Sequence, residues 1–214
     1  MIISDNNCYE VLTMVVNMQS MPGMPQPRSG WRGNVDRLIG PGATSAELLV
    51  QFVPAVAMAI AAPLYAKSVS ADFTGWQLGL IAFFALDFMG GTLTNATAAA
   101  KRWFHRPGQG WQQHLGFVAF HLCHIAVVAI AFRGIDWGFL ISMSSYLLLA
   151  TGVILASLLY LQRSIALGLF ILALLGDCYL IAPMPGLEWF VPLLFLKLLV
   201  SHLPKENAYQ PGDR

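Results

Sequence analysis

The chain has 214 residues, of which 57% are hydrophobic and 11% are charged. In soluble domains about a quarter of the residues are charged. The apolar residues here form runs of roughly 20, the length that crosses a bilayer. This composition excludes an ordinary soluble domain, and the net charge of +1 gives no general attraction to nucleic acid. We therefore expect an all-α, polytopic integral membrane protein of the bacterial cytoplasmic (inner) membrane.

Six apolar segments organise the chain. The first 45 residues are rich in Met, Pro, Gly and Asn without a sustained period, which predicts a disordered cytoplasmic tail over 1–45. A transmembrane domain follows over 46–203, and the polar residues 204–214 form a cytoplasmic C-terminal tail. The predicted spans are Ala46–Ala66, Trp76–Ala96, Gln113–Arg133, Trp137–Leu161, Ser164–Ala182 and the short Leu187–Leu203.

The basic residues indicate how these spans are oriented. With the N-terminus in the cytoplasm, the cytoplasmic segments hold nine of the 12 Lys and Arg residues. The outer loops hold Lys67 and Arg133, and Lys197 lies inside the last span. This asymmetry follows the positive-inside rule. It predicts a six-transmembrane-helix bundle with both termini in the cytoplasm (N-in and C-in).

One carboxylate and two imidazoles are expected at the same depth in the bilayer. Asp87 lies at the middle of the second span, and His121 and His124 lie on either side of the middle of the third. An ionisable group at this depth costs between about 2.5 and more than 10 kcal/mol. Because antiparallel spans joined by a short loop normally pack together, the sequence predicts that these three side chains meet.

Further polar residues share the faces on which these three lie. On the third span, His114, His121 and His124 fall on one face at about 100° per residue. On the second span, Asp87 and Asn95 belong to a stripe of small and polar residues that permits close helix approach. These five residues are our candidates for handling a ligand or a proton.

Three interpretations of the buried site remain open. Two imidazoles and a carboxylate suit a divalent transition metal, with Asp87, His121 and His124 as the ligands. The same side chains suit a proton relay, because a histidine near neutral pKa exchanges protons with a carboxylate. They could also form hydrogen bonds that only fix helix packing. A less favoured cofactor is haem b, held between His114 and His202, which are level with each other.

The loop that joins the second and third spans mixes cations with aromatic residues. It reads KRWFHRPGQGW, and Lys101, Arg102 and Arg106 are predicted to bind anionic lipid headgroups, so membrane lipid is an expected partner. Lys197 is expected to snorkel toward the same membrane surface. Three loop cations are too few for nucleic-acid binding.

Catalytic signatures are absent from the sequence, including HExxH, GxSxG and a phosphate-binding glycine loop. Whether the chain is an enzyme therefore stays open. The leading hypothesis is a membrane protein whose Asp/His site binds or passes a proton, an ion or a small ligand, as in transport. The alternatives are a metal-dependent membrane enzyme acting on a lipid-like substrate, and a non-catalytic subunit of a homo-oligomer or larger membrane complex.

Overall fold

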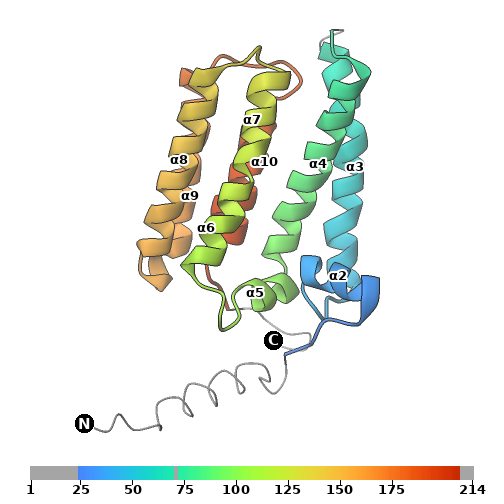
Figure 1. Ribbon diagram of the computed structural model, residues 1–214, viewed down its shortest axis with the longest axis vertical. Helices are drawn as coiled ribbons and strands as arrows, with labels where there is room; N and C mark the ends of the chain where they lie inside the picture. Colours follow the sequence, from blue (N-terminus) through green and yellow to red (C-terminus); the bar gives the residue numbers. More distant parts are fainter. Residues whose placement is uncertain (1–23, 70–71, 208–214) are drawn as a thin grey trace, which may run out of the picture.

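The computed structural model describes residues 24–69 and 72–207, and all of its regular elements are helical. Figure 1 shows a bundle of upright helices with two short helices, α2 and α5, lying across one end. The predicted all-α class is confirmed. The elements are α2 (Gly30–Ile39), α3 (Ser45–Val69), α4 (Gly75–Ala96), α5 (Ala98–Phe104), α6 (Trp111–Phe120), α7 (Leu122–Ala131), α8 (Trp137–Ala156), η1 (Leu159–Leu161), α9 (Gln162–Leu180), α10 (Phe190–Phe195) and η2 (Leu196–His202).

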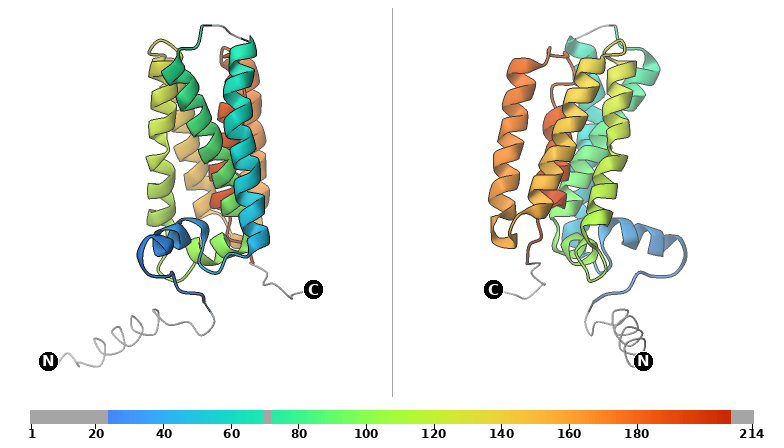
Figure 2. Two further views of the ribbon diagram at one scale, coloured as in Figure 1. Left: turned by 90° about the vertical axis from the view of Figure 1, so that its right-hand side faces the viewer. Right: turned by 60° about the vertical axis from the view of Figure 1, so that its left-hand side comes forward.

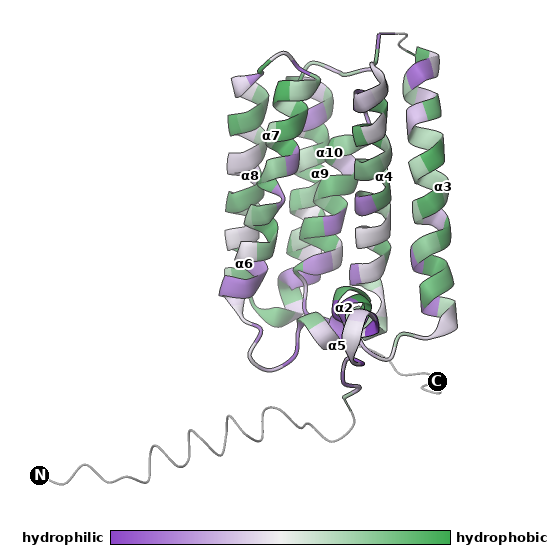
Figure 3. Cartoon of the chain, turned by 45° about the vertical axis from the view of Figure 1, so that its right-hand side comes forward, coloured by the Kyte–Doolittle hydropathy of each residue, from purple (hydrophilic) through white to green (hydrophobic). Residues whose placement is uncertain are grey.

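Within residues 24–69 and 72–207, five helical segments are long and apolar enough to cross a membrane. They are α3, α4, the pair α6–α7, α8, and η1 together with α9. Hydrophobic residues cover these segments along their length, and hydrophilic residues gather at the end that carries α2 and α5 (Figure 3). The chain is thus a multi-pass helical membrane protein, with one long span fewer than the six predicted.

The predicted sixth span is a short segment inside the bundle. The chain leaves α9 and runs without helix over 181–189 before α10 and the π-helical η2 begin. Their six and seven residues cover only about 20 Å, less than the roughly 30 Å of a hydrocarbon core. Helices α4, α8 and α9 pack around this segment, which Figure 2 shows in red among the other helices. Most of its apolar side chains are buried.

Both described ends of the chain lie at the same end of the bundle, which we call the α5 end. The Trp103 indole donates to the Arg37 carbonyl at 3.1 Å, which joins α5 to α2. Lys101 Nζ donates to the Pro204 carbonyl at 2.7 Å, which joins α5 to the residues after η2. Gly40 (φ 90°) has no room for a side chain, because a Cβ would lie 2.4 Å from the Ala99 backbone.

The segment predicted as a disordered tail contains a helix. Residues 1–23 lie outside the described part, but Gly30–Ile39 forms α2. Three hydrogen bonds of 2.7–2.9 Å join the backbone and guanidinium of Arg28 to Asp36. The guanidinium lowers the pKa of Asp36 to about 2. The polar composition concealed this helix, because its single buried stripe is too short to give a sustained period.

Candidate functional site

An ion pair between a buried lysine and a partly exposed carboxylate lies at the middle of the bundle. Lys197, on η2, donates from Nζ to Asp87 Oδ2, on α4, at 2.6 Å. The Lys197 side chain is 3% exposed and the Asp87 side chain 33% exposed. The expectation that Lys197 snorkels to the membrane surface is therefore wrong. Since η2 starts inside the bundle rather than at the membrane surface, its lysine is level with the centre of α4.

Two local features let the lysine reach the carboxylate. The first is Gly91, one turn after Asp87 on α4, where an added Cβ would lie 2.4 Å from Lys197 Cε. The second is the π-helical winding of η2, in which Leu203 N donates to the carbonyl of Leu198, five residues earlier. Short π-helical turns frequently occur at functional sites, because they redirect side chains from the regular helical spacing.

The third predicted span is interrupted at one of its candidate residues. His121 separates α6 from α7, and its backbone N donates to Val118 O at 2.9 Å, three residues earlier. Its ring Nδ1 lies 2.8 Å from the Phe117 carbonyl. A carbonyl oxygen can only accept, so Nδ1 carries the proton and Nε2 of a neutral ring remains an acceptor.

The predicted meeting of the carboxylate with the imidazoles is observed for one of the two. His124 Nε2 lies 3.6 Å from Asp87 Oδ2, and the ring of His121 stacks on that of His124 at 5.1 Å. Aromatic side chains surround this pair. The rings of Phe84 and Phe88 lie 5.3 and 5.4 Å from that of His124. Helix α4 therefore reaches α7 through its side chains, while its backbone packs against α3 and η2.

A second group of histidines lies at the α5 end. His114 Nδ1 is 3.1 Å from His202 Nε2, so one ring donates to the other. His105 Nε2 donates to the His202 carbonyl at 3.0 Å, and its ring stacks on His114 at 4.6 Å. His202 Nδ1 is buried and has no hydrogen-bond partner among the described residues.

One aromatic ring connects the two groups. The ring of Phe117 lies 4.1 Å from that of His202 and 4.6 Å from that of His121. All five histidines of the sequence therefore lie in one row from the α5 end to Asp87. We call this series the histidine row: His105, His114, His202, His121 and His124.

Charged groups at the start of the row are held in the protein rather than at its surface. Lys101 is buried, and its Nζ lies 3.9 Å from Glu206. Burial lowers the pKa of Lys101 to about 8, although the charge of Glu206 opposes this shift. Burial also lowers the pKa of His105 to about 4, assisted by the charges of His114 and Lys101.

The three predicted lipid-headgroup residues are arranged differently from one another. Lys101 points toward the residues after η2 and is not available to a headgroup. Arg106 lies with its guanidinium carbon 3.6 Å from the centre of the Trp103 ring. Arg102 and Arg106 are both half-buried at the α5 end, and headgroup binding by these two arginines stays a prediction.

The geometry of the described residues gives the metal and haem hypotheses no support. Among the described residues, no three His, Cys, Asp or Glu side chains are placed to hold a metal ion, and a lysine ammonium already occupies the carboxylate. The ring nitrogens of His114 and His202 are in direct contact. Metal–imidazole bonds of about 2 Å each would need these nitrogens farther apart, with the macrocycle between them. Asn95 is also buried. It lies about 12 Å from Asp87 along the axis of α4.

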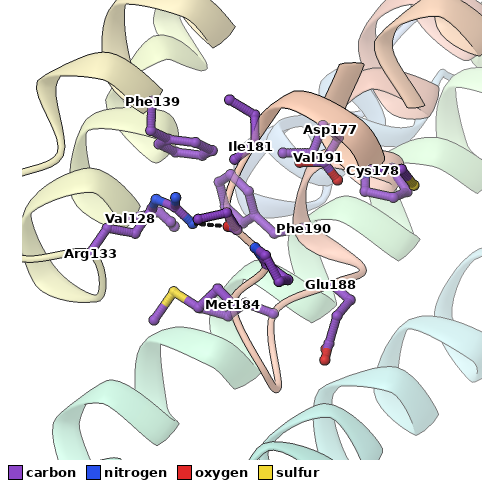
Figure 4. Close-up of a pocket in the computed structure, with 14 residues that line it drawn as sticks. Val128, Arg133, Phe139, Asp177, Cys178, Ile181, Met184, Glu188, Phe190 and Val191 are labelled. Atoms are coloured by element: carbon purple, nitrogen blue, oxygen red, sulfur yellow. Dashed lines mark hydrogen bonds between the residues drawn. The ribbon is translucent and has the colours of Figure 1, made fainter. Parts of the chain in front are cut away.

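A pocket of about 270 Å³ lies at the far end of the bundle. Arg133 projects across it, donating to the Ala182 carbonyl at 3.1 Å, with Asp177 on the other side of the pocket (Figure 4). Phe190 forms part of its floor, and the ring of Phe190 lies 5.2 Å from that of Phe88. The pocket is therefore separated from the site at Asp87 by aromatic side chains. Sequence reasoning missed it because the chain over 181–189 creates it.

Comparisons of the chain with protein-family models, with curated proteins and with solved structures find no match. The class is defined by the structure itself. In the part of the chain that the structure describes, five apolar helices of spanning length carry a central ion pair and buried histidines, which are the features of a multi-pass integral membrane protein.

Proposed function

We propose that this protein passes protons through the membrane along the histidine row, with Asp87 as the central acceptor. The observation that supports this proposal most directly is the series of all five imidazoles from the α5 end to the carboxylate, in which only the Phe117 ring lies between His202 and His121. Histidine is the side chain that exchanges protons most readily near neutral pH. Ionisable residues inside membrane bundles commonly form proton relays.

The section of the row at the α5 end contains one direct hydrogen bond between imidazoles. The contact of 3.1 Å between His114 and His202 is short enough for direct proton exchange. A proton that leaves His114 for His202 Nε2 makes the buried Nδ1 of His202 the next donor. The acceptor beyond it is Nε2 of His121, whose own Nδ1 is fixed on the Phe117 carbonyl.

Phe117 divides the row into two sections. Its ring lies between His202 and His121 and offers neither a donor nor an acceptor. Protons would pass only when this ring moves and a water molecule bridges the two imidazoles. We therefore assign Phe117 the role of a barrier that limits the rate.

The neighbours of Asp87 allow this central acceptor to be either a charged carboxylate or a protonated acid. Lys197 stabilises the Asp87 carboxylate, and His124 lies beside the same oxygen. The His124 imidazole can transfer a proton to the Asp87 carboxylate while the Lys197 ammonium stays in contact with Oδ2. Beyond Asp87, the rings of Phe84, Phe88 and Phe190 separate it from the pocket that opens at the far end.

Proton flux into vesicles tests this proposal. The protein is reconstituted in liposomes that contain a pH-sensitive dye, and a potassium gradient with valinomycin sets the potential. We expect faster internal acidification than in protein-free vesicles. The double variant Asp87→Asn/Lys197→Met removes both charges together, so no buried charge is left unpaired, and we expect the added flux to disappear.

The matched control is Phe52→Ala, which truncates an exposed residue of α3 away from the row and should carry protons as the wild type does. Folding of each variant is checked by its elution as a single species in mild detergent. A folded Asp87→Asn/Lys197→Met variant with wild-type flux would contradict the proposal.

A further inference from the structure

The central carboxylate is open on one side. The Asp87 side chain is 33% exposed although it lies at the middle of a span, while its partner Lys197 is buried. Lys197 contacts Oδ2, and the described residues provide no hydrogen bond to Oδ1. A polar oxygen that faces hydrocarbon without a partner is costly. The exposed side of Asp87 therefore calls for a hydrogen-bond donor that comes from the bilayer.

Two exposed aromatic residues lie beside His124, the imidazole that approaches Asp87. Phe83 and Phe120, from α4 and α6, are 55% and 69% exposed. The ring of Phe83 is nearly parallel to that of His124, with an interplanar angle of 5° and 6.5 Å between the centroids. The ring of Phe120 lies edge-on to His124 at 6.3 Å. The partly exposed carboxylate and two exposed aromatic rings are thus both neighbours of His124.

We infer that a hydroxylated aromatic compound dissolved in the bilayer binds beside Asp87 from the lipid side. Its hydroxyl would donate to Oδ1, and its ring would contact Phe83 and Phe120. This inference rests on the proposed function in one respect: the bound hydroxyl would share the carboxylate that the histidine row reaches, so the ligand would exchange its proton there.

The chemistry of the site favours this ligand over other occupants. A cationic ligand would compete with the Lys197 ammonium, which lies 2.6 Å from the same carboxylate. A second copy of the chain that docked through this face would bring a second Asp87 toward the first. A neutral hydroxyl on an aromatic ring can donate to the free oxygen without adding charge, and the ring stacks favourably on the phenylalanine rings.

Photolabelling with 4-hydroxybenzophenone tests the inference, because this probe is itself a photoreactive phenol. The full-length protein in liposomes is irradiated with the probe, and adducts are mapped by mass spectrometry. We expect adducts on residues 83–87 and 120–123. Their yield should exceed that of benzophenone, which lacks the hydroxyl, by about tenfold, the factor that one hydrogen bond to a charged acceptor supplies.

Phe120→Ala should reduce this labelling severalfold, while Phe52→Ala should leave it unchanged. Equal labelling by both probes would overturn the inference. So would a protein that excludes the phenol and forms a dimer covering Asp87. Labelling needs no proton flux, so its outcome is independent of the liposome assay. Site-specific labelling without flux would retain this inference and refute the proposed function.

Discussion

Lys197 Nζ and Asp87 Oδ2 lie 2.6 Å apart although 110 residues separate them in the chain. This contact joins the central η2 segment to α4 and occupies one oxygen of the carboxylate that the histidine row approaches. Replacing Gly91 or changing either charge should therefore affect both the packing of η2 and the chemistry of the site.

The first prediction concerns the two charges themselves. Asp87→Asn leaves the Lys197 ammonium buried without a counter-ion, and Lys197→Met leaves the carboxylate unpaired. Removing one partner of a fully buried pair typically costs about 3–5 kcal/mol. Because the Asp87 side chain is 33% exposed, we expect a smaller loss here, and each single variant should unfold at a lower temperature. In the double variant no unpaired charge remains, and most of the loss should be recovered. Thermal unfolding in mild detergent, followed by tryptophan fluorescence, measures all three. Additive losses would contradict a direct pair.

The second prediction uses two glycines of α4. Gly91→Ala places a Cβ 2.4 Å from Lys197 Cε, which should displace the ammonium and cost about 1–3 kcal/mol through overpacking. Gly79→Ala is the matched control, because no atom lies within 4 Å of the added Cβ. That change should be neutral or stabilise the helix by about 0.5–1 kcal/mol. Chemical unfolding of both variants checks the contrast, and equal stability of the two would refute the role given to Gly91.

The third prediction concerns the barrier in the histidine row. Phe117→Ala should leave space in which water can connect His202 with His121, and proton flux into liposomes should rise severalfold. Phe195→Ala removes a buried ring of the same size from α10, where it contacts Tyr146 rather than a histidine. This control should reduce stability without raising flux. A comparable increase in both variants would indicate general leakiness instead.

The fourth prediction follows from the lowered pKa of His105, which is about 4 in the folded protein and about 6.5 when unfolded. The unfolded chain binds more protons between these values, so this group's contribution to stability is fully present above pH 6.5 and is lost as the pH falls toward 4. The charged or titratable groups that face the His105 ring are His114, Lys101 and Lys205. The ring also donates a hydrogen bond to the His202 carbonyl.

The titration of His105 can be followed by NMR of histidine-labelled protein in nanodiscs. We expect its ring to remain neutral at pH 6. His105→Gln, which keeps a donor for the carbonyl, should flatten the pH dependence of stability between pH 6.5 and 4. A ring that titrates near 6.5 would show that it is solvated in the folded protein.

Individual residues show which positions in the bundle can be predicted from the sequence and which cannot. The depth of Asp87 and His124 could be predicted because spans of similar length that reverse at a short loop bring their midpoints level. The sequence also predicts that His114 and His202 are level with each other, but as haem ligands, whereas their rings are in direct contact at 3.1 Å. Lys197 could not be placed correctly, because its depth depends on where the last helix begins. The non-helical chain over 181–189 decides that point.

The sequence by itself determined that the chain is helical and crosses a membrane, because apolar runs of spanning length bury their backbone hydrogen bonds only as helices. It also determined which side chains are too costly to lie at the bilayer centre without a role. The tertiary structure alone decided their partners. It placed the short α10–η2 segment inside the bundle, and it left the Asp87 side chain partly exposed. Such contacts depend on the position and winding of distant helices, which no local period encodes.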